Sequence, residues 1–369
     1  MIIMNEYVVS LIIVDTSSFE KEQFDFISAK SASVVSLFEL LKSKDIKLLV
    51  HPVLDREIRK HIKDSGVFKS VEKLKNTLSQ MKNFMIKNRY CDNKLIENLN
   101  NTNVDNLLSE AYSKYYSDAI ILDYPDPKII FSQYFNNIAP FSKEKNKKSE
   151  FPDAFIIQSV KDYLSLNPNE RLLVVSGDND WKAAFKDNNK VIWKESIVDA
   201  LTFLNSVDSI LSTKKIEKIF ESVKSDLEES INDIFYDCPC QVNGFDEWED
   251  TIINTAKLKN IISNIKPLKV TRDKLILRVG ISLSVTGSGK KFQSDYSAWD
   301  DEDKRYLFKS YNDISFDNGI LDTDIEVDID YDFNAPESTA EISDIKIIDN
   351  SWLLVDKVTE VSVIETSRF

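Results

Sequence analysis

The stretch Leu172-Leu-Val-Val-Ser-Gly-Asp178-Asn-Asp180-Trp181 decides the fold class of the N-terminal part of this chain. Four apolar residues, typical of a buried strand, lead directly into an acidic turn, and Lys182-Ala-Ala-Phe185 then has the pattern of a helix. In an open α/β sheet, ligands bind where strands end and helices begin. Asp178 alone has a simpler explanation, because aspartate is a common N-cap of a helix. The turn becomes a candidate site only if further residues join it.

A second stretch of the same form, Ser10-Leu-Ile-Ile-Val-Asp15-Thr-Ser17, is an apolar strand that ends in an aspartate. Apolar side chains on one helical face then predict a helix over residues 31–44, and residues 46–50 predict another buried strand. A strand, a helix and a strand in succession form a βαβ unit with parallel strands and a right-handed crossover. Pro52 suits the start of the next helix, which carries Glu57 at the same edge of the sheet.

The middle of this domain is helical in pattern. Residues 68–123 are polar with apolar residues at helical spacing, and residues 126–139 predict one more amphipathic helix, so we expect a helical insertion over about residues 68–140. After a basic loop, Phe151-Pro-Asp153 predicts a helix start with Asp153 in its first turn. The strand and helix patterns that follow complete an alternating β/α series, which predicts an α/β domain over residues 1–207.

The pattern changes in the last part of the chain. Residues 208–234 predict a charged connecting helix. Within residues 235–369, several segments alternate apolar and polar side chains, which predicts a mainly antiparallel, β-rich α+β domain with one solvated face. In this domain we expect a helix over residues 246–262 and a hairpin turn at Gly287-Ser-Gly289.

The composition is that of a globular protein, with 42% hydrophobic residues in a chain of 369. Three cysteines and two histidines are too few and too scattered for a disulfide framework or a Cys/His zinc site, and a reducing cytoplasm suits them best. The N-terminus lacks a positively charged start, so we do not expect a signal peptide. No apolar stretch has the length of a membrane span.

The net charge of −14 is concentrated in the last domain. After residue 230 there are 27 Asp and Glu against 15 Lys and Arg, whereas the preceding residues hold 34 against 32. An acidic balance usually argues against nucleic-acid binding, but here that argument does not apply to the first domain. The acidic domain is open to several roles: a surface for a homodimer or a protein partner, or a mimic of nucleic acid that shields the first domain.

Carboxylates of the first domain should converge. The C-terminal ends of parallel strands lie at one edge of a sheet, which brings Asp15, Glu57 and Asp178 together, and Asp153 at a helix start is a fourth candidate. Each acid alone also fits a helix cap, a helix dipole or a surface ion pair. Clustered carboxylates repel each other, and a divalent cation relieves that repulsion most simply. Oxygen ligands favour Mg²⁺ or Mn²⁺, which commonly activate water against a phosphodiester.

The order of these acids, with its strand and helix contexts, resembles the PIN domain, the fold of many metal-dependent ribonucleases, including bacterial toxin nucleases. The resemblance covers about residues 8–205 and is nearest to a variant with a long helical insertion. It implies a three-layer parallel sheet, and it matches the four acids of the family to Asp15, Glu57, Asp153 and Asp178. It also matches a frequent fifth acid to Asp180, and the Ser or Thr of the Ser/Thr-x-Asp motif to Ser176.

These features predict a metal-dependent endoribonuclease that hydrolyses phosphodiester bonds. The resemblance implies that Mg²⁺ or Mn²⁺ is bound by Asp15, Asp153, Asp178 and Asp180, with Glu57 as a further catalytic residue. The expected substrate-binding residues are Ser176 and, in the basic loop before Asp153, Lys145, Lys147 and Lys148.

The expected partner is single-stranded or structured RNA, and the sequence does not separate RNA from DNA. A toxin or the nuclease of a defence module is compatible with this organisation. The alternative function is a catalytically inactive PIN fold that serves as a scaffold or a binding protein. An absence of Mn²⁺ binding would favour that alternative.

Overall fold

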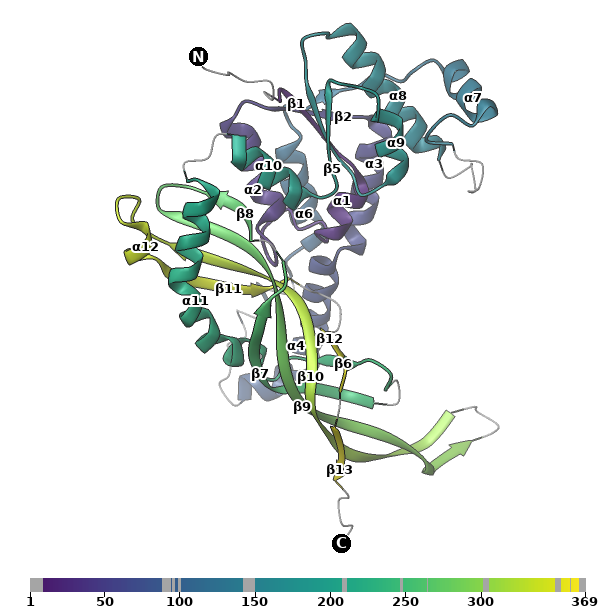
Figure 1. Cartoon of the computed structure of the whole chain (residues 1–369). Helices are drawn as coiled ribbons and strands as arrows, with labels where there is room; N and C mark the ends of the chain where they lie inside the picture. The colour runs from purple at the N-terminus through teal and green to yellow at the C-terminus, as the bar shows by residue number, and fades with distance from the viewer. Residues whose placement is uncertain are drawn as a thin grey trace. The chain divides into compact units, whose positions relative to one another are not determined.

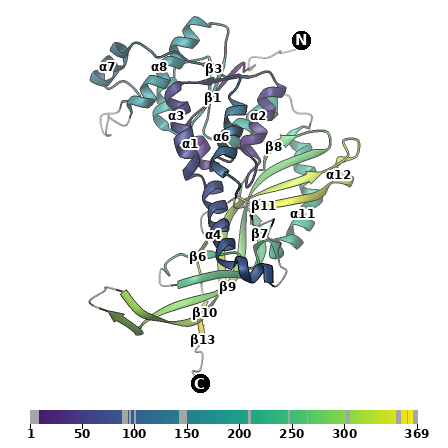
Figure 2. The same cartoon turned by 180° about the vertical axis from the view of Figure 1, so that it is seen from behind.

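The computed structural model describes residues 9–87, 94, 97–98, 101–141, 150–207, 211–245, 248–263, 265–300, 305–348, 353–358 and 360–364. Its contacts divide the chain into two compact units, Met1–Asp208 and Ser209–Phe369. Figure 1 shows the elements of both units, and Figure 2 shows them from behind. No helix within the described ranges is both long enough and apolar enough to cross a membrane.

A five-stranded parallel sheet forms the centre of the first unit, in the order β3-β2-β1-β4-β5. This confirms the predicted α/β class and the parallel strands. The strands are β1 (Leu11–Val14), β2 (Lys47–Val50), β3 (Ile120–Ile121), β4 (Leu172–Val175) and β5 (Val191–Lys194). Every residue of β1 and β4 is buried, whereas the residues of β5 are only half-buried. Continuous apolar strands therefore take the centre of the sheet, where helices cover both faces.

Helices flank both faces of this sheet, giving the expected three layers (Figures 1 and 2). On one face α2 (Ser33–Ser43) packs against α10 (Ile197–Val207). On the other face α3 contacts both α1 and α8, and α8 contacts α9. These four helices are α1 (Thr16–Lys21), α3 (Pro52–His61), α8 (Phe151–Leu166) and α9 (Asn179–Phe185). The described helices of the inserted region are η1 (Ile62–Asp64), α4 (Gly66–Lys87), α6 (Val104–Tyr115) and α7 (Pro127–Asn136).

The strand β3 was missed by the sequence pattern, which predicted helix through residue 123. Ile120 and Ile121 instead pair in parallel with Leu49 and Val50 of β2. Two residues are too few to show a period of two, so only the neighbouring strand identifies this one.

An eight-stranded mixed sheet forms the second unit, as the predicted β-rich class requires. Its order is β6-β12-β10-β9-β7, with β11 and β13 paired to β10 and β8 paired to β9. Among the described strands the pairs are antiparallel except for β6 with β12. The strands are β6 (Cys240–Val242), β7 (Trp248–Ile261), β8 (Lys266–Val270), β9 (Lys274–Asp300), β10 (Arg305–Asp330), β11 (Glu341–Ile347), β12 (Leu353–Asp356) and β13 (Glu360–Ile364).

Two helices accompany this sheet, α11 (Thr213–Phe235) and the short α12 (Pro336–Thr339). The apolar side chains of α11 recur every three or four residues, and the stripe from Ile219 to Ile231 is buried in the core of the second unit. This helix packs on β7. By its contacts α11 is therefore part of the second unit, although its charged sequence suggested a connector.

The predicted helix over residues 246–262 is wrong. Trp248–Ile261 form strand β7, which pairs antiparallel with β9. The segment contains β-branched residues such as Thr251, Ile253 and Thr255, which suit a pleated surface. Pairing with the long neighbouring strand therefore outweighs the helical spacing of its apolar residues.

The predicted hairpin turn at Gly287-Ser-Gly289 is also wrong, because β9 continues through it. A Cβ atom at Gly287 would stand 2.3 Å from the carbonyl oxygen of Ile252 and 2.3 Å from the ring of Phe316. Glycine in a strand often marks such a close approach. Gly287 therefore allows close packing inside the sheet instead of a change of chain direction.

Candidate active site

Asp15 is the first residue after β1 and the N-cap of α1. Its backbone N–H donates to the carbonyl oxygen of Val175 at 2.9 Å, which joins the end of β1 to the end of β4. Asp15 is only 7% exposed, and its carboxylate accepts hydrogen bonds from the hydroxyls of Ser17 and Ser176, the latter at 2.9 Å. Burial raises the pKa of Asp15, these hydroxyls partly oppose the rise, and the charge of Asp178 adds to it.

The turn after β4 is organised by the Ser176 hydroxyl, which is fully buried. It donates to Asp15 at 2.9 Å and accepts from the backbone N–H of Asp178 at 3.0 Å. Asp178 in turn caps α9, because its Oδ1 accepts from the backbone N–H of Asp180 at 2.6 Å. Ser176 therefore holds two acids in place, while its contact with a substrate stays a prediction. The cap uses one oxygen of Asp178, and a carboxylate has two.

Asp153 lies in the first turn of α8, which begins with Phe151 and Pro152 as the sequence predicted. The indole Nε1–H of Trp181 donates to Oδ1 of Asp153 at 3.0 Å. Burial raises the pKa of Asp153 to about 7, and the negative charges of Asp15, Asp178 and Glu57 add to the rise. The Trp181 hydrogen bond opposes it. A carboxyl with this pKa is partly protonated near neutral pH.

Glu57 lies on α3 and is half-buried. Burial raises its pKa first, and the charge of Asp15 adds to that rise. The hydrogen bond with the Thr16 hydroxyl and the electrostatic interactions with His61 and Lys60 oppose this rise. Glu57 therefore lies within electrostatic range of Asp15.

The four acids come from four different elements and form one electrostatic cluster. The charges of the other three acids raise the pKa of Asp153. The charge of Asp15 raises the pKa of Glu57, and the charge of Asp178 raises the pKa of Asp15. Like charges raise carboxyl pKa values in this way only at short range. The structure therefore brings Asp15, Glu57, Asp153 and Asp178 together at the C-terminal edge of the sheet.

The remaining predicted site residues differ in what the structure shows of them. Asp180 lies in the first turn of α9, with its backbone bonded to Asp178, and its role as a metal ligand stays a prediction. Lys145, Lys147 and Lys148 lie outside the described residues.

Sequence reasoning missed two residues that support the acids. Trp181 is fully buried and reaches from α9 to Asp153 on α8. The N-cap of α3, the helix that carries Glu57, is the fully buried His51, whose Nδ1 accepts from the backbone N–H of Val53 at 3.2 Å. Burial lowers the pKa of His51 to about 4, so the ring is neutral. In the sequence, these roles are indicated only by an indole or imidazole next to an acidic motif. That pattern does not identify the group to which the ring is hydrogen-bonded.

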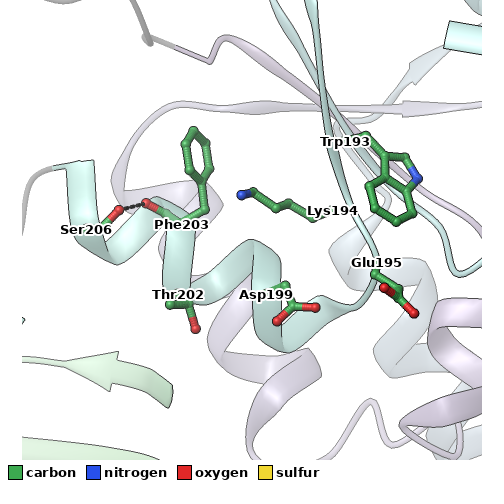
Figure 3. Close-up of a pocket in the computed structure, with 7 residues that line it drawn as sticks. All are labelled: Trp193, Lys194, Glu195, Asp199, Thr202, Phe203 and Ser206. Carbon is green, nitrogen blue, oxygen red and sulfur yellow. Dashed lines mark hydrogen bonds between the residues drawn. The ribbon is translucent and has the colours of Figure 1, made fainter. Parts of the chain in front are cut away.

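A pocket of about 440 Å³ lies at the end of β5 and along α10 (Figure 3). The Lys194 side chain extends toward Phe203, with Nζ 4.7 Å from the ring centroid. The backbone of Lys194 accepts a hydrogen bond from Ser176 N–H at 3.0 Å, so this pocket borders the acidic turn. Its lining residues are Trp193, Lys194, Glu195, Asp199, Thr202, Phe203 and Ser206. The four clustered acids are not among them.

In the part of the chain that is described, no three His, Cys, Asp or Glu side chains are arranged to hold one ion as they stand. The mutual repulsion of the acids and the cap made by Asp178 both work against such an arrangement. The donor set still fits Mg²⁺ or Mn²⁺, since it consists of carboxylate oxygens. Shared binding requires these side chains to turn toward a common point.

The parallel sheet and the acid cluster at its edge define an α/β protein with a candidate site of four carboxylates. Residues 12–181 match the model of the PIN domain family. These residues make up most of the first unit and are similar to the PIN domain family, whose members are in general nucleases that use divalent metals. The matched range includes all four clustered acids and ends at Trp181. No curated protein matches this chain.

Proposed function

We propose that this chain is a metal-dependent endoribonuclease that hydrolyses phosphodiester bonds. The observation that carries the proposal is the pKa of Asp153, raised to about 7 by burial and by the charges of Asp15, Asp178 and Glu57. Burying carboxylates that repel one another does not stabilise a fold, and such clusters are typical of functional sites. The PIN domain match over residues 12–181 supports nuclease chemistry for this cluster.

Each residue has a role in this proposal. Asp15, Asp153 and Asp178 would hold Mg²⁺ or Mn²⁺, and Asp180 would complete the site. The bound ion would activate a water molecule and stabilise the leaving oxygen of the phosphodiester. Glu57 would orient a water molecule and accept its proton, a task that suits a carboxylate whose pKa is raised by burial. Ser176 fixes the positions of Asp15 and Asp178 relative to each other through its two hydrogen bonds.

The proposed substrate is single-stranded or structured RNA, with its phosphates held by Lys145, Lys147 and Lys148. A cytoplasmic setting suits the free thiols of Cys238 and Cys240. A role as a toxin or as the nuclease of a defence module fits a nuclease unit joined to a second, acidic unit. The second unit would then provide the surface for a homodimer or a protein partner.

Isothermal titration with Mn²⁺ tests the proposed metal site without any activity assay. We expect the full-length protein to bind Mn²⁺, and Asp15→Asn to weaken binding at least about tenfold because the variant removes one anionic ligand. Asp187→Asn is the matched control, since this exposed acid follows α9 and lies outside the cluster. If the parent protein bound no Mn²⁺ and cleaved no RNA in its presence, the catalytically inactive scaffold would be the better description.

Trp181→Phe tests the support of Asp153. Phenylalanine keeps an aromatic ring in the buried position but removes the N–H that donates to Oδ1 of Asp153 at 3.0 Å. We expect Mn²⁺ affinity to fall about tenfold, as is common when a ligand loses its orienting hydrogen bond. We also expect the lower limb of the pH–rate profile to move to higher pH, because this hydrogen bond lowers the pKa of Asp153. Unchanged Mn²⁺ affinity in a folded variant would assign Trp181 to packing alone.

A further inference from the structure

Exposed apolar side chains of the first unit gather in one short segment. Among the described residues of this unit, six of the exposed large hydrophobic side chains lie between residues 121 and 138. They are Ile121, Tyr124, Ile129, Phe131, Phe135 and Ile138. The others are scattered singly at Ile27, Leu74, Leu107 and Leu166. Scattered exposed residues are ordinary, whereas a concentration of them marks a binding surface.

The outward face of α7 combines aromatic rings with a cation. Phe131 is 51% exposed and Phe135 is 75% exposed, and their spacing of four residues places them side by side on the helix. Lys128, also exposed, precedes Phe131 by three residues and lies on the same face. Ile130 on the opposite face is fully buried. The helix is therefore fixed in place by one side and presents two rings and an ammonium group on the other.

Ring contacts connect this face to the first turn of α8, which carries Asp153. Phe131 lies 5.9 Å from Phe151, measured between ring centroids, and Tyr134 lies 5.4 Å from Phe135 and 5.2 Å from Phe151. Phe151 is the first residue of α8, two positions before Asp153. A side-chain hydrogen bond of 2.7 Å from Gln133 to Gln158 also joins α7 to α8. Figure 1 shows α7 beside α8. The exposed rings thus continue from the helix that carries Asp153.

We propose that Phe131 and Phe135 form a stacking platform for the bases of a single-stranded RNA whose scissile phosphate lies at the acid cluster, with Lys128 on its backbone. This inference rests on the proposed nuclease function. Exposed ring faces bind unpaired bases regardless of sequence, and a nearby cation holds the phosphates. A duplex hides its base faces, so the platform selects single strands. A protein partner would need no position near the acids, whereas Phe131 contacts Phe151 in the helical turn that also carries Asp153.

The test measures strand binding in EDTA, so that its result does not depend on cleavage. Full-length protein is titrated into a fluorescently labelled oligoadenylate, and separately into the same strand annealed to its complement. We expect the double variant Phe131→Leu, Phe135→Leu to weaken single-strand binding by about tenfold or more, because leucine is apolar but does not stack. Phe131→Tyr with Phe135→Tyr should bind like the parent. Leu166→Ala, which removes a side chain that is 82% exposed on the far end of α8, is the control.

Each outcome decides the proposal. The platform is supported if the leucine variant binds the single strand more weakly and the tyrosine variant binds it like the parent. In cleavage assays with Mg²⁺, the leucine variant should then show a larger rise in KM than fall in kcat. Equal strand binding by the parent and the leucine variant, or no binding by the parent, overturns it. A change of oligomeric state in the leucine variant with unchanged strand binding also overturns it, in favour of a protein contact. A parent that binds strands through these rings but cleaves none with Mg²⁺ or Mn²⁺ refutes the nuclease function while retaining the platform.

Discussion

Asp153→Asn is expected to slow RNA cleavage about 10³-fold and, at the same time, to stabilise the metal-free protein above neutral pH. The loss of activity follows from the removal of a charge that would hold the metal at the head of α8. The gain in stability follows from the raised pKa of Asp153, about 7, which reflects burial and the charges of Asp15, Asp178 and Glu57. An uncharged amide in this position relieves the repulsion and can still accept the Trp181 hydrogen bond.

The sign of the pH dependence follows from the direction of this pKa shift. A carboxyl whose pKa is higher in the folded state than in the unfolded state stabilises the fold below its unfolded pKa, and this stability is lost as pH rises through the folded pKa. For Asp153 the loss extends from its ordinary value of 3.8 to about 7. In EDTA we therefore expect the free energy of unfolding of the first unit to fall by about 2 kcal/mol between about pH 5 and pH 8. In Asp153→Asn this fall should be smaller.

Thermal unfolding in EDTA, measured across this pH range for parent and variant, checks the prediction. Asp187→Asn is again the control for the loss of one negative charge, since this exposed residue does not interact with the cluster acids in the way Asp153 does. Mn²⁺ should raise the melting temperature of the parent more than that of Asp153→Asn, because the ion offsets the repulsion only where its ligands are complete. A variant that is less stable than the parent in EDTA at about pH 8 would contradict the assigned repulsion.

Gly287→Val is expected to destabilise the second unit by about 3 kcal/mol. The Cβ atom of any other residue would stand 2.3 Å from the Ile252 carbonyl oxygen and 2.3 Å from the ring of Phe316. Phe316 is 1% exposed, so its ring has little freedom to move away, and the carbonyl belongs to the neighbouring strand β7. The strands must therefore separate locally to accept the new side chain. Gly287→Ala should also lower the free energy of unfolding of the second unit, but by less than Gly287→Val.

Urea unfolding of the full chain, monitored by hydrogen exchange of individual peptides, measures the loss of stability separately in the two units. We expect faster exchange in peptides of β7, β9 and β10 and no change in the strands of the first unit. Ser284→Val is the matched control, because Ser284 lies on the same strand and is exposed. If Gly287→Val unfolded at the same urea concentration as Ser284→Val, the close approach would not limit the stability of this sheet.

The acids illustrate how far a single sequence leads. Asp15 and Asp178 follow fully apolar strands, and Pro152 marks the helix start that precedes Asp153, so local patterns were enough to place each of them. Their convergence followed from one rule of topology, since parallel strands end at the same edge. The electrostatic coupling of Asp153 to the other three acids agrees with that expectation. Trp181 was overlooked because the partner of an indole N–H lies 28 residues away in the chain.

The second unit shows where local patterns fail. Residues 246–262 had helical spacing, yet Trp248–Ile261 form strand β7, and Gly287-Ser-Gly289 had the composition of a turn, yet it lies within strand β9. In each case the deciding neighbour is remote in the chain: β9 pairs with β10 along most of its length and with β7 from Ile281 to Lys291. Strand formation depends on such partners more than helix formation does, because each hydrogen bond of a strand is made to another segment.

The amino-acid order alone was sufficient for the class of the first unit, the parallel strands and the four acids, because buried strands and helix starts are encoded over a few neighbouring residues. Tertiary structure alone decided three further features: the Trp181 support of Asp153, the aromatic face of α7 beside α8, and the continuous strands of the second unit. These features depend on contacts between segments that are distant in the chain. Such contacts are set by packing in three dimensions, which local periodicity does not record.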